Sequence, residues 1–162
     1  MSTHSGEDTA HAGRLRRDQR LPHIGWREWV ALPDLGIDPI KAKIDTGART
    51  SALHAFFVEP FRERGVSMVR FKVHPFQRRT DIETECCAEV IDCRWVTDSG
   101  GHRERRHVIR SLVQLGGSRW EVEMTLTNRD TMRFRMLLGR SAIAGQFAVD
   151  PGASYVIGRR AR

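Results

Sequence analysis

The chain has 162 residues, of which 40 % are hydrophobic, and this is enough to fill the core of one domain but not of two independent ones. Its 27 Lys and Arg against 20 Asp and Glu give a formal net charge of +7. That charge favours an anionic partner such as nucleic acid, the ribosome or an acidic peptide, although a generic basic surface is an equally good interpretation. Because no apolar run has the length of a secretory signal or a membrane span, we expect a cytoplasmic protein without membrane contact.

The two ends of the chain differ in composition from its middle. Residues 1–22 hold charged side chains and no continuous apolar run, so we expect a disordered, basic N-terminal arm. Residues 23–158 are expected to form the folded domain, and residues 159–162 a basic C-terminal tail.

The first half of the domain is predicted to contain three strands. The first covers residues 24–32 and is closed by the turn-forming sequence of residues 33–36. The second, over residues 40–45, ends in Asp45, and the third, over residues 66–74, alternates apolar and polar side chains.

The middle of the chain is predicted to be a β-meander. Strong turn signals at residues 98–101 and 116–118 separate three longer strand candidates, residues 85–97, 104–115 and 120–127. Shorter strands are expected at residues 133–138, 147–149 and 155–157, with one helical turn at residues 141–145. Regularly spaced turns between alternating strands indicate an all-β closed barrel.

The sequence Asp45-Thr46-Gly47 follows the second strand directly. A strand end holds a carboxylate rigidly, the Thr46 hydroxyl can join the hydrogen bonds beneath it, and Gly47 lets backbone approach backbone. This pattern is typical of the catalytic turn of an aspartic peptidase, although a strand that merely ends in a turn could have the same sequence.

A second segment supports the first. Residues 136–143 form an apolar strand that breaks at Gly139. Retropepsins have the same pair of segments in the same order, an Asp-Thr-Gly turn early and an apolar-apolar-Gly-Arg segment near the end. The resemblance implies a retropepsin-like barrel in which Leu138, Gly139 and Arg140 support the catalytic turn from behind.

A closer resemblance covers about residues 26–158. Residues 45–55, 126–130 and 136–140 are similar to the bacterial RimB-type retropepsin-like peptidases. This family accompanies RimK-type ATP-grasp ligases, which add glutamates to a ribosomal protein. The resemblance implies a peptidase that acts on α-linked polyglutamate, with such a ligase and a ribosomal protein as partners.

The chain contains a single Asp-Thr-Gly sequence and no internal repeat. Aspartic peptidases need two carboxylates that share one proton, so the second must come from another subunit. We therefore expect a C2 homodimer in which Asp45 faces its symmetry mate.

Substrate contacts are expected from Ala48, Arg49, His54, Asn128 and Arg129. The Arg49 guanidinium can bind a glutamate carboxylate with two hydrogen bonds, although a structural ion pair is an alternative role. His54 could equally be a packed or solvated histidine. Asn128 and Arg129 match the family pattern, but a turn between strands explains them equally well.

We expect neither a metal nor a cofactor. Although the family has also been labelled an ATP-dependent zinc protease, the sequence has no His-Glu-x-x-His helix and no phosphate-binding loop. Cys86, Cys87 and Cys93 are interpreted as buried or half-buried thiols, and a zinc site built from Cys93, His102 and His107 would have no recognised spacing.

Two functions without catalysis remain as alternatives. The barrel could bind the ribosome or RNA through its basic surface, or it could regulate a glutamate ligase without cutting a peptide. Dispensability of Asp45 would favour either of them.

Overall fold

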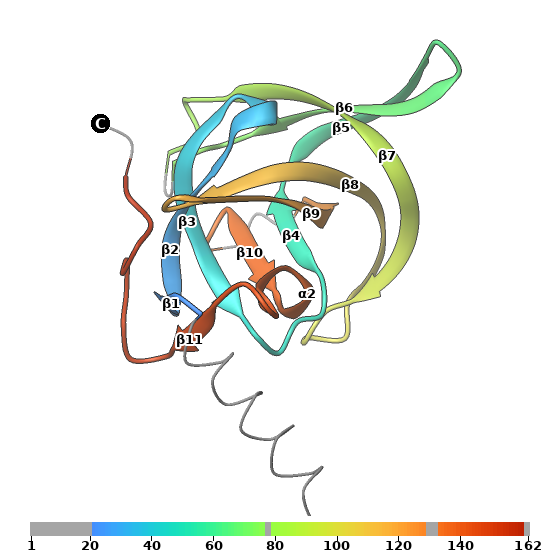
Figure 1. Ribbon diagram of the computed structural model, residues 1–162. Helices are drawn as coiled ribbons and strands as arrows, with labels where there is room; N and C mark the ends of the chain where they lie inside the picture. Colours follow the sequence, from blue (N-terminus) through green and yellow to red (C-terminus); the bar gives the residue numbers. More distant parts are fainter. Residues whose placement is uncertain (1–20, 77–78, 129–132, 161–162) are drawn as a thin grey trace, which may run out of the picture.

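The computed structural model describes residues 21–76, 79–128 and 133–160, which fold mainly as β-strands (Figure 1). The elements are β1 (His23–Gly25), β2 (Arg27–Leu32), the 3-10 helix η1 (Pro33–Leu35), β3 (Ile37–Asp45), β4 (Ser51–His54), β5 (Phe56–Glu63), β6 (Val66–Val73), β7 (Thr84–Thr97), β8 (Arg103–Leu115), β9 (Ser118–Thr127), β10 (Met136–Gly139), α2 (Arg140–Ile143) and β11 (Ala148–Asp150). Most of the expected N-terminal arm and the last two residues of the expected tail lie outside the described residues.

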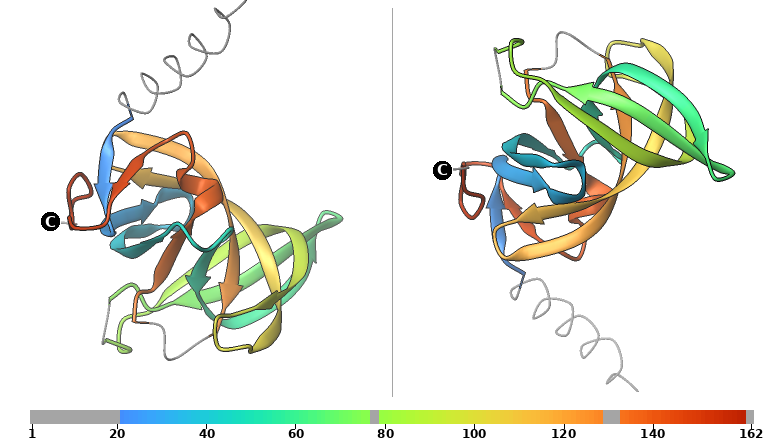
Figure 2. Two further views of the ribbon diagram at one scale, coloured as in Figure 1. Left: turned by 90° about the horizontal axis from the view of Figure 1, so that it is seen from below. Right: turned by 90° about the horizontal axis from the view of Figure 1, so that it is seen from above.

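Six strands close into a barrel in the order β2-β3-β10-β4-β9-β8, and Ala31 of β2 pairs with Gln114 of β8 to complete the circle. The sheet continues beyond β8 through β7, β6 and β5, so that β5 to β9 form one antiparallel meander. The predicted closed all-β barrel is thus confirmed. The β5–β6 hairpin projects from the barrel in every view (Figure 1, Figure 2).

Side chains that alternate along the strands fill the barrel. Val30, Ile40, Ile109, Met124 and Leu138, from five different strands, are all at most 1 % exposed. Alternate residues point to opposite faces of a strand, so the apolar positions of each strand converge on one interior. Burial of this apolar surface stabilises the barrel and holds its strand ends in fixed positions.

Strand β10 lies between β3, which ends at Asp45, and β4, which follows the Asp45 turn. It runs parallel to β3, with Gly139 opposite Asp45, and antiparallel to β4, with Leu137 opposite Ala52. Residues far apart in the sequence are therefore joined by backbone hydrogen bonds next to the Asp45 turn.

The predicted strand over residues 24–32 is in fact two strands. β1 pairs with β11 in a separate two-stranded sheet, whereas β2 pairs with β3. The break follows from the backbone at Trp26, whose N–H bonds to the carbonyl of Ala153 and whose carbonyl accepts from Ile44.

Strands β4 and β5 were not predicted. β4 is buried at all four positions, which removes the alternation expected of a half-exposed strand. β5 contains Pro60, which usually argues against a strand, but β5 forms the edge of the sheet, where a missing N–H is tolerated.

The predicted strand at residues 155–157 was also wrong. Tyr155 donates its N–H to the carbonyl of Arg27 in β2 at 2.9 Å, but the N–H groups of the next residues bond to a buried carboxylate, so no strand ladder continues. Glu28 is 0 % exposed. Its two oxygens accept the backbone N–H groups of Gly25 and Val156 at 2.8 Å, Ile157 at 3.0 Å and Gly158 at 2.7 Å. Glu28 thereby fastens the C-terminal segment to the outside of the barrel (Figure 1).

Candidate active site

The Asp45 turn begins where β3 leaves the barrel. Asp45 is half-buried, and its Oδ1 accepts the backbone N–H groups of Gly47 at 3.0 Å and Ala48 at 3.2 Å. Both hydrogen bonds fix the orientation of the carboxylate. Both use the same oxygen, and Oδ2 accepts no hydrogen bond from the described part of the chain.

Strand β10 and helix α2 support the turn from behind. The backbone N–H groups of Arg140 and Ser141 donate to the carbonyls of Ala48 at 2.7 Å and Arg49 at 3.1 Å. The Arg140 guanidinium adds a hydrogen bond of 3.2 Å to the carbonyl of Thr46. These contacts set the conformation of residues 46–49.

Gly139 lets β10 and the loop after Asp45 approach each other. A Cβ atom at this position would lie 2.6 Å from the Thr50 carbonyl carbon and 2.8 Å from its oxygen. The Gly139 N–H also donates to the buried Ser51 hydroxyl at 3.0 Å. Gly139 and Arg140 thus contact the loop after Asp45, and Leu138 pairs with Ile44 just before it; their role as supports of a catalytic turn stays a prediction.

The turn opens into a cleft of about 720 Å³. Asp45, Gly47, Ala48 and Arg49 line one wall, and the opposite wall comes from β7, β8 and the turn between them, including residues 96–99. In Figure 1 this β7–β8 turn and the loop that joins β3 to β4 lie at the same lower end of the barrel, and both line the cleft. A peptide could reach the Asp45 carboxylate from this cleft.

Three arginines line the cleft: Arg49, Arg94 and Arg106. Arg49 is exposed, and in residues 21–76, 79–128 and 133–160 it has no ion pair, so the alternative of a structural ion pair finds no support there. Arg94 bonds through Nε to Asp92 at 2.6 Å. Arg106 is only 7 % exposed.

A polar network holds Arg106 in place. Its Nε forms an ion pair with Glu104, and its Nη1 donates to the Thr125 hydroxyl at 3.4 Å. The Thr127 hydroxyl donates to the same Glu104 carboxylate at 2.6 Å. Burial works to raise the pKa of Glu104, but the hydrogen bonds from Thr127 and Arg106 outweigh it and hold the pKa below its ordinary value.

The other expected substrate contacts are not all in this cleft. Ala48 and Arg49 line it, whereas His54 and Asn128 line a separate hollow of about 330 Å³ together with Phe56, Phe57 and His74. His54 is 2 % exposed, and Arg129 lies outside the described residues. Their roles in substrate binding stay predictions, as do the catalytic roles of Thr46 and Gly47.

Sequence reasoning missed the opposite wall of the cleft. Arg94 and Arg106 belong to different strands, and nothing in the linear sequence shows that they line the same cleft as Asp45. One signal was available: Arg106 lies two positions before the buried Val108, which places it on the inward face of a strand where a charged residue is unusual.

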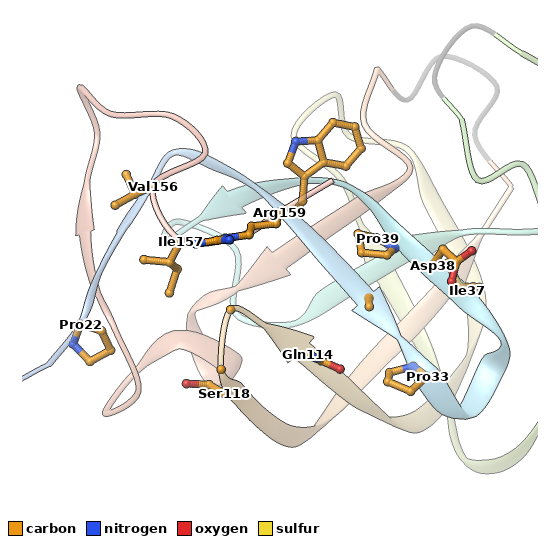
Figure 3. A pocket seen from close by; sticks show the side chains of 14 residues that line it. Pro22, Pro33, Ile37, Asp38, Pro39, Gln114, Ser118, Val156, Ile157 and Arg159 are labelled. Atoms are coloured by element: carbon orange, nitrogen blue, oxygen red, sulfur yellow. The ribbon is translucent and has the colours of Figure 1, made fainter. Parts of the chain in front are cut away.

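A further hollow, of about 860 Å³, lies on another side of the barrel, between the C-terminal segment and β2 (Figure 3). Figure 3 shows mostly proline and aliphatic side chains around it, with Asp38 well apart from Arg159. Its lining therefore offers no converging acid and base for hydrolysis.

Within residues 21–76, 79–128 and 133–160, the cysteines and histidines do not converge on a metal site. In the part of the chain that the structure describes, no three His, Cys, Asp or Glu side chains could hold a metal ion together, and Cys93, His102 and His107 are not such a group. Cys86 is buried, which raises the pKa of its thiol to about 11. Cys93 is half-buried, as expected. The expectation was wrong for Cys87, which is exposed because it follows the buried Cys86 on β7 and neighbours on a strand face opposite sides.

No helix among the described residues is both long enough and apolar enough to cross a membrane.

Some known proteins are similar to this chain in sequence, and one solved structure is similar to it in fold. The chain is 48 % identical over 137 residues to a "Probable alpha-L-glutamate ligase" of Shewanella pealeana and 44 % identical over 135 residues to a protein of the same name from Parasynechococcus marenigrum. The matches cover 85 % and 83 % of this chain but only 30 % and 29 % of those relatives.

The crystal structure of Lpg0085 from Legionella pneumophila, a protein described as of unknown function, superposes with a TM-score of 0.68 at 27 % identity. That match covers 84 % of this chain and 98 % of the Legionella protein. The family model for the "Retropepsin-like aspartic endopeptidase RimB" matches residues 23–160. With a closed barrel, an Asp-Thr-Gly turn and a supporting Leu-Gly-Arg segment, the chain belongs to the RimB-like family of retropepsin-like aspartic endopeptidases.

Proposed function

We propose that the protein is an aspartic endopeptidase that hydrolyses peptide bonds in α-linked polyglutamate tails added to a ribosomal protein by a RimK-type ligase. The observation that carries the proposal is the position of the Asp45 carboxylate. Two backbone N–H groups hold one of its oxygens, and Asp45 lines a cleft of about 720 Å³. A carboxylate held in this way can activate water without forming a covalent bond to the substrate.

Hydrolysis requires a second carboxylate, which we assign to Asp45 of a second copy of the chain. Two carboxylates a few ångströms apart do not both ionise readily, so the pair holds one proton. The ionised member accepts a proton from water as the water oxygen attacks the peptide carbonyl carbon, and the protonated member donates to the carbonyl oxygen. Thr46 is exposed next to Asp45, where it could bond to the partner's turn.

The polyglutamate substrate is supported by the charge of the site and by the names of the relatives. Arg49 lies next to the catalytic turn and lines the cleft. The relatives named as glutamate ligases contain a segment similar to this chain within a longer protein. A ligase that adds glutamates and a peptidase that removes them would act on the same cytoplasmic protein.

A test is to incubate the purified protein with an α-linked hexaglutamate peptide and to follow the products by mass spectrometry. We expect shortened glutamate peptides with the wild type and none with Asp45→Asn. Addition of a zinc chelator should not change the rate. Absence of cleavage by the wild type, or equal cleavage by the Asp45 variant, would refute the proposal.

Regulation of a glutamate ligase without cleavage is the second candidate, because the relatives carry the name of the ligase. It predicts that Asp45→Asn retains its effect on the rate of a RimK-type ligase. Loss of that effect in the variant would argue against it.

A further inference from the structure

The wall of the cleft opposite Asp45 brings two positive charges together. Arg94 of β7 and Arg106 of β8 are direct partners in the antiparallel ladder, and both line the cleft. Like charges opposite each other on neighbouring strands destabilise a sheet unless acidic neighbours compensate them. Both arginines have such neighbours, so the two guanidinium groups can lie side by side at the cleft.

Each guanidinium group is anchored by an acidic residue. Asp92 holds Nε of Arg94, and Glu123 lies 3.5 Å from its Nη2. Glu104 holds Nε of Arg106, and Thr125 contacts its Nη1. Anchoring fixes the two side chains before a ligand arrives, so that binding costs less side-chain entropy.

The anchoring contacts leave one nitrogen of each group for a ligand. The hydrogen bonds and ion pairs that the described residues make to Arg94 use Nε and Nη2, and those to Arg106 use Nε and Nη1. Nη1 of Arg94 and Nη2 of Arg106 make no such contact within the described residues, so we assign these two nitrogens as the donors to a ligand in the cleft. A carboxylate has two oxygens and could accept from both.

We propose that the Arg94–Arg106 pair is a carboxylate-binding subsite of the Asp45 cleft, which holds an acidic peptide while Asp45 reaches a neighbouring peptide bond. This inference rests on the proposed function for the identity of the ligand, but its recognition step does not require cleavage. The carboxylate could belong to a glutamate side chain or to the C-terminus of the peptide, and the two cases are separable by experiment.

The pair differs from Arg49 in the kind of attraction that it provides. The acidic partners of Arg94 and Arg106 compensate their charge, so the pair acts by directed hydrogen bonds at short range. Arg49, which has no acidic partner among the described residues, acts at longer range and is screened by salt. Specificity is therefore assigned to the pair and salt dependence to Arg49.

The test measures binding of α-linked hexaglutamate to the 162-residue chain with Asp45→Asn by isothermal titration calorimetry, so that no cleavage occurs. Arg94→Gln or Arg106→Lys is added to this background. The lysine keeps a positive charge for Glu104, which protects the fold, but it lacks the planar fork. Arg110→Gln is the matched control, because Arg110 also bonds to Glu123, at 3.2 Å, but does not line the cleft.

We expect Arg94→Gln and Arg106→Lys each to raise Kd by about fivefold to tenfold at every salt concentration, since each loses a charge-assisted hydrogen bond. Arg110→Gln should leave Kd within about twofold. Arg49→Gln should instead flatten the dependence of Kd on salt. Unchanged affinity in both pair variants, or no binding of hexaglutamate at all, would overturn the subsite.

Two further peptides identify the group that is bound. If a hexaglutamate with an amidated C-terminus shows the same dependence on the pair, the ligand is a side-chain carboxylate; if only the free acid does, it is the chain end. A neutral Gln/Ser peptide of equal length should bind equally weakly to all the variants, and a dependence of its binding on the pair would contradict carboxylate recognition.

The cleavage assay keeps the two claims apart. Binding that depends on the pair without cleavage by the wild type would refute the proposed peptidase and leave the subsite standing. Cleavage by the wild type with no effect of either pair variant on KM would support the proposed peptidase and refute the subsite.

Discussion

Asp45 and Glu28 are both carboxylates that accept backbone N–H groups, but they are satisfied to different degrees. Glu28 is 0 % exposed, and four N–H groups at 2.7 to 3.0 Å occupy both of its oxygens. Asp45 is half-buried, and two N–H groups occupy Oδ1 alone. A carboxylate whose oxygens are all used stabilises the fold, whereas one with an oxygen to spare at the edge of a cleft can take part in a reaction.

The same chemical change at the two positions should have opposite consequences. Asp45→Asn should lower the cleavage rate by at least about 1000-fold and shift Tm little, since the amide retains the shape but cannot share the catalytic proton. Glu28→Gln should lower the free energy of unfolding by about 3 kcal/mol, because the amide NH₂ would face backbone donors. Thermal unfolding and the peptide assay measure both effects.

An unchanged Tm in Glu28→Gln would refute the structural role of Glu28. Substantial cleavage by Asp45→Asn would refute the catalytic role of Asp45.

Gly139→Ala tests how strongly the Asp45 turn depends on its support. A Cβ placed 2.6 Å from the Thr50 carbonyl carbon forces β10 and the loop apart. We expect a loss of about 2 kcal/mol in the free energy of unfolding. We also expect a fall of about tenfold in kcat, because Asp45 is displaced.

Gly117→Ala is the matched control for Gly139, since a Cβ there would meet nothing within 4 Å. Equal effects of the two substitutions on kcat would show that the contact behind the turn is unimportant.

Acid should weaken the wall of the cleft through Glu104. The pKa of this carboxyl is lower in the folded protein than its ordinary value of 4.5, so its contribution to stability is complete above that value and is lost as the pH falls through the folded pKa. Thr127→Val removes one of the hydrogen bonds responsible.

We expect Thr127→Val to cost about 1 kcal/mol at pH 7, and the difference from the wild type to shrink as the pH falls through the folded pKa of Glu104. Urea unfolding at pH 7 and pH 3 measures this difference, with Thr97→Val as the exposed control. A difference that stays constant with pH would show that the hydrogen bond from Thr127 to Glu104 does not cause the loss of stability.

The sequence predicted the parts of the fold that depend on local patterns. The meander of β7 to β9 was predictable because Asp98 and the glycines of residues 100–101 and 116–117 mark the turns between alternating strands. The Asp45 turn and its Gly139 support were predictable from short motifs and a family resemblance.

The parts that were missed depend on contacts between distant residues. β5 is tolerated as a strand only because it lies at the sheet edge, and residues 155–157 leave the sheet because Glu28, 128 residues earlier than Val156, accepts the N–H of that residue. The Arg94–Arg106 pair depends in the same way on the register between β7 and β8.

The most direct test of the account asks whether Asp45 acts as one of a pair. Wild-type and Asp45→Asn chains are mixed in equal amounts, unfolded and refolded together, and compared with the same total amount of wild type. If the catalytic site is shared between two chains, only wild-type dimers cleave hexaglutamate, and the activity falls to about one quarter. A control mixture of wild type and Arg110→Gln should keep full activity. An activity of about one half would mean that each chain cleaves alone, and it would contradict the shared carboxylate pair.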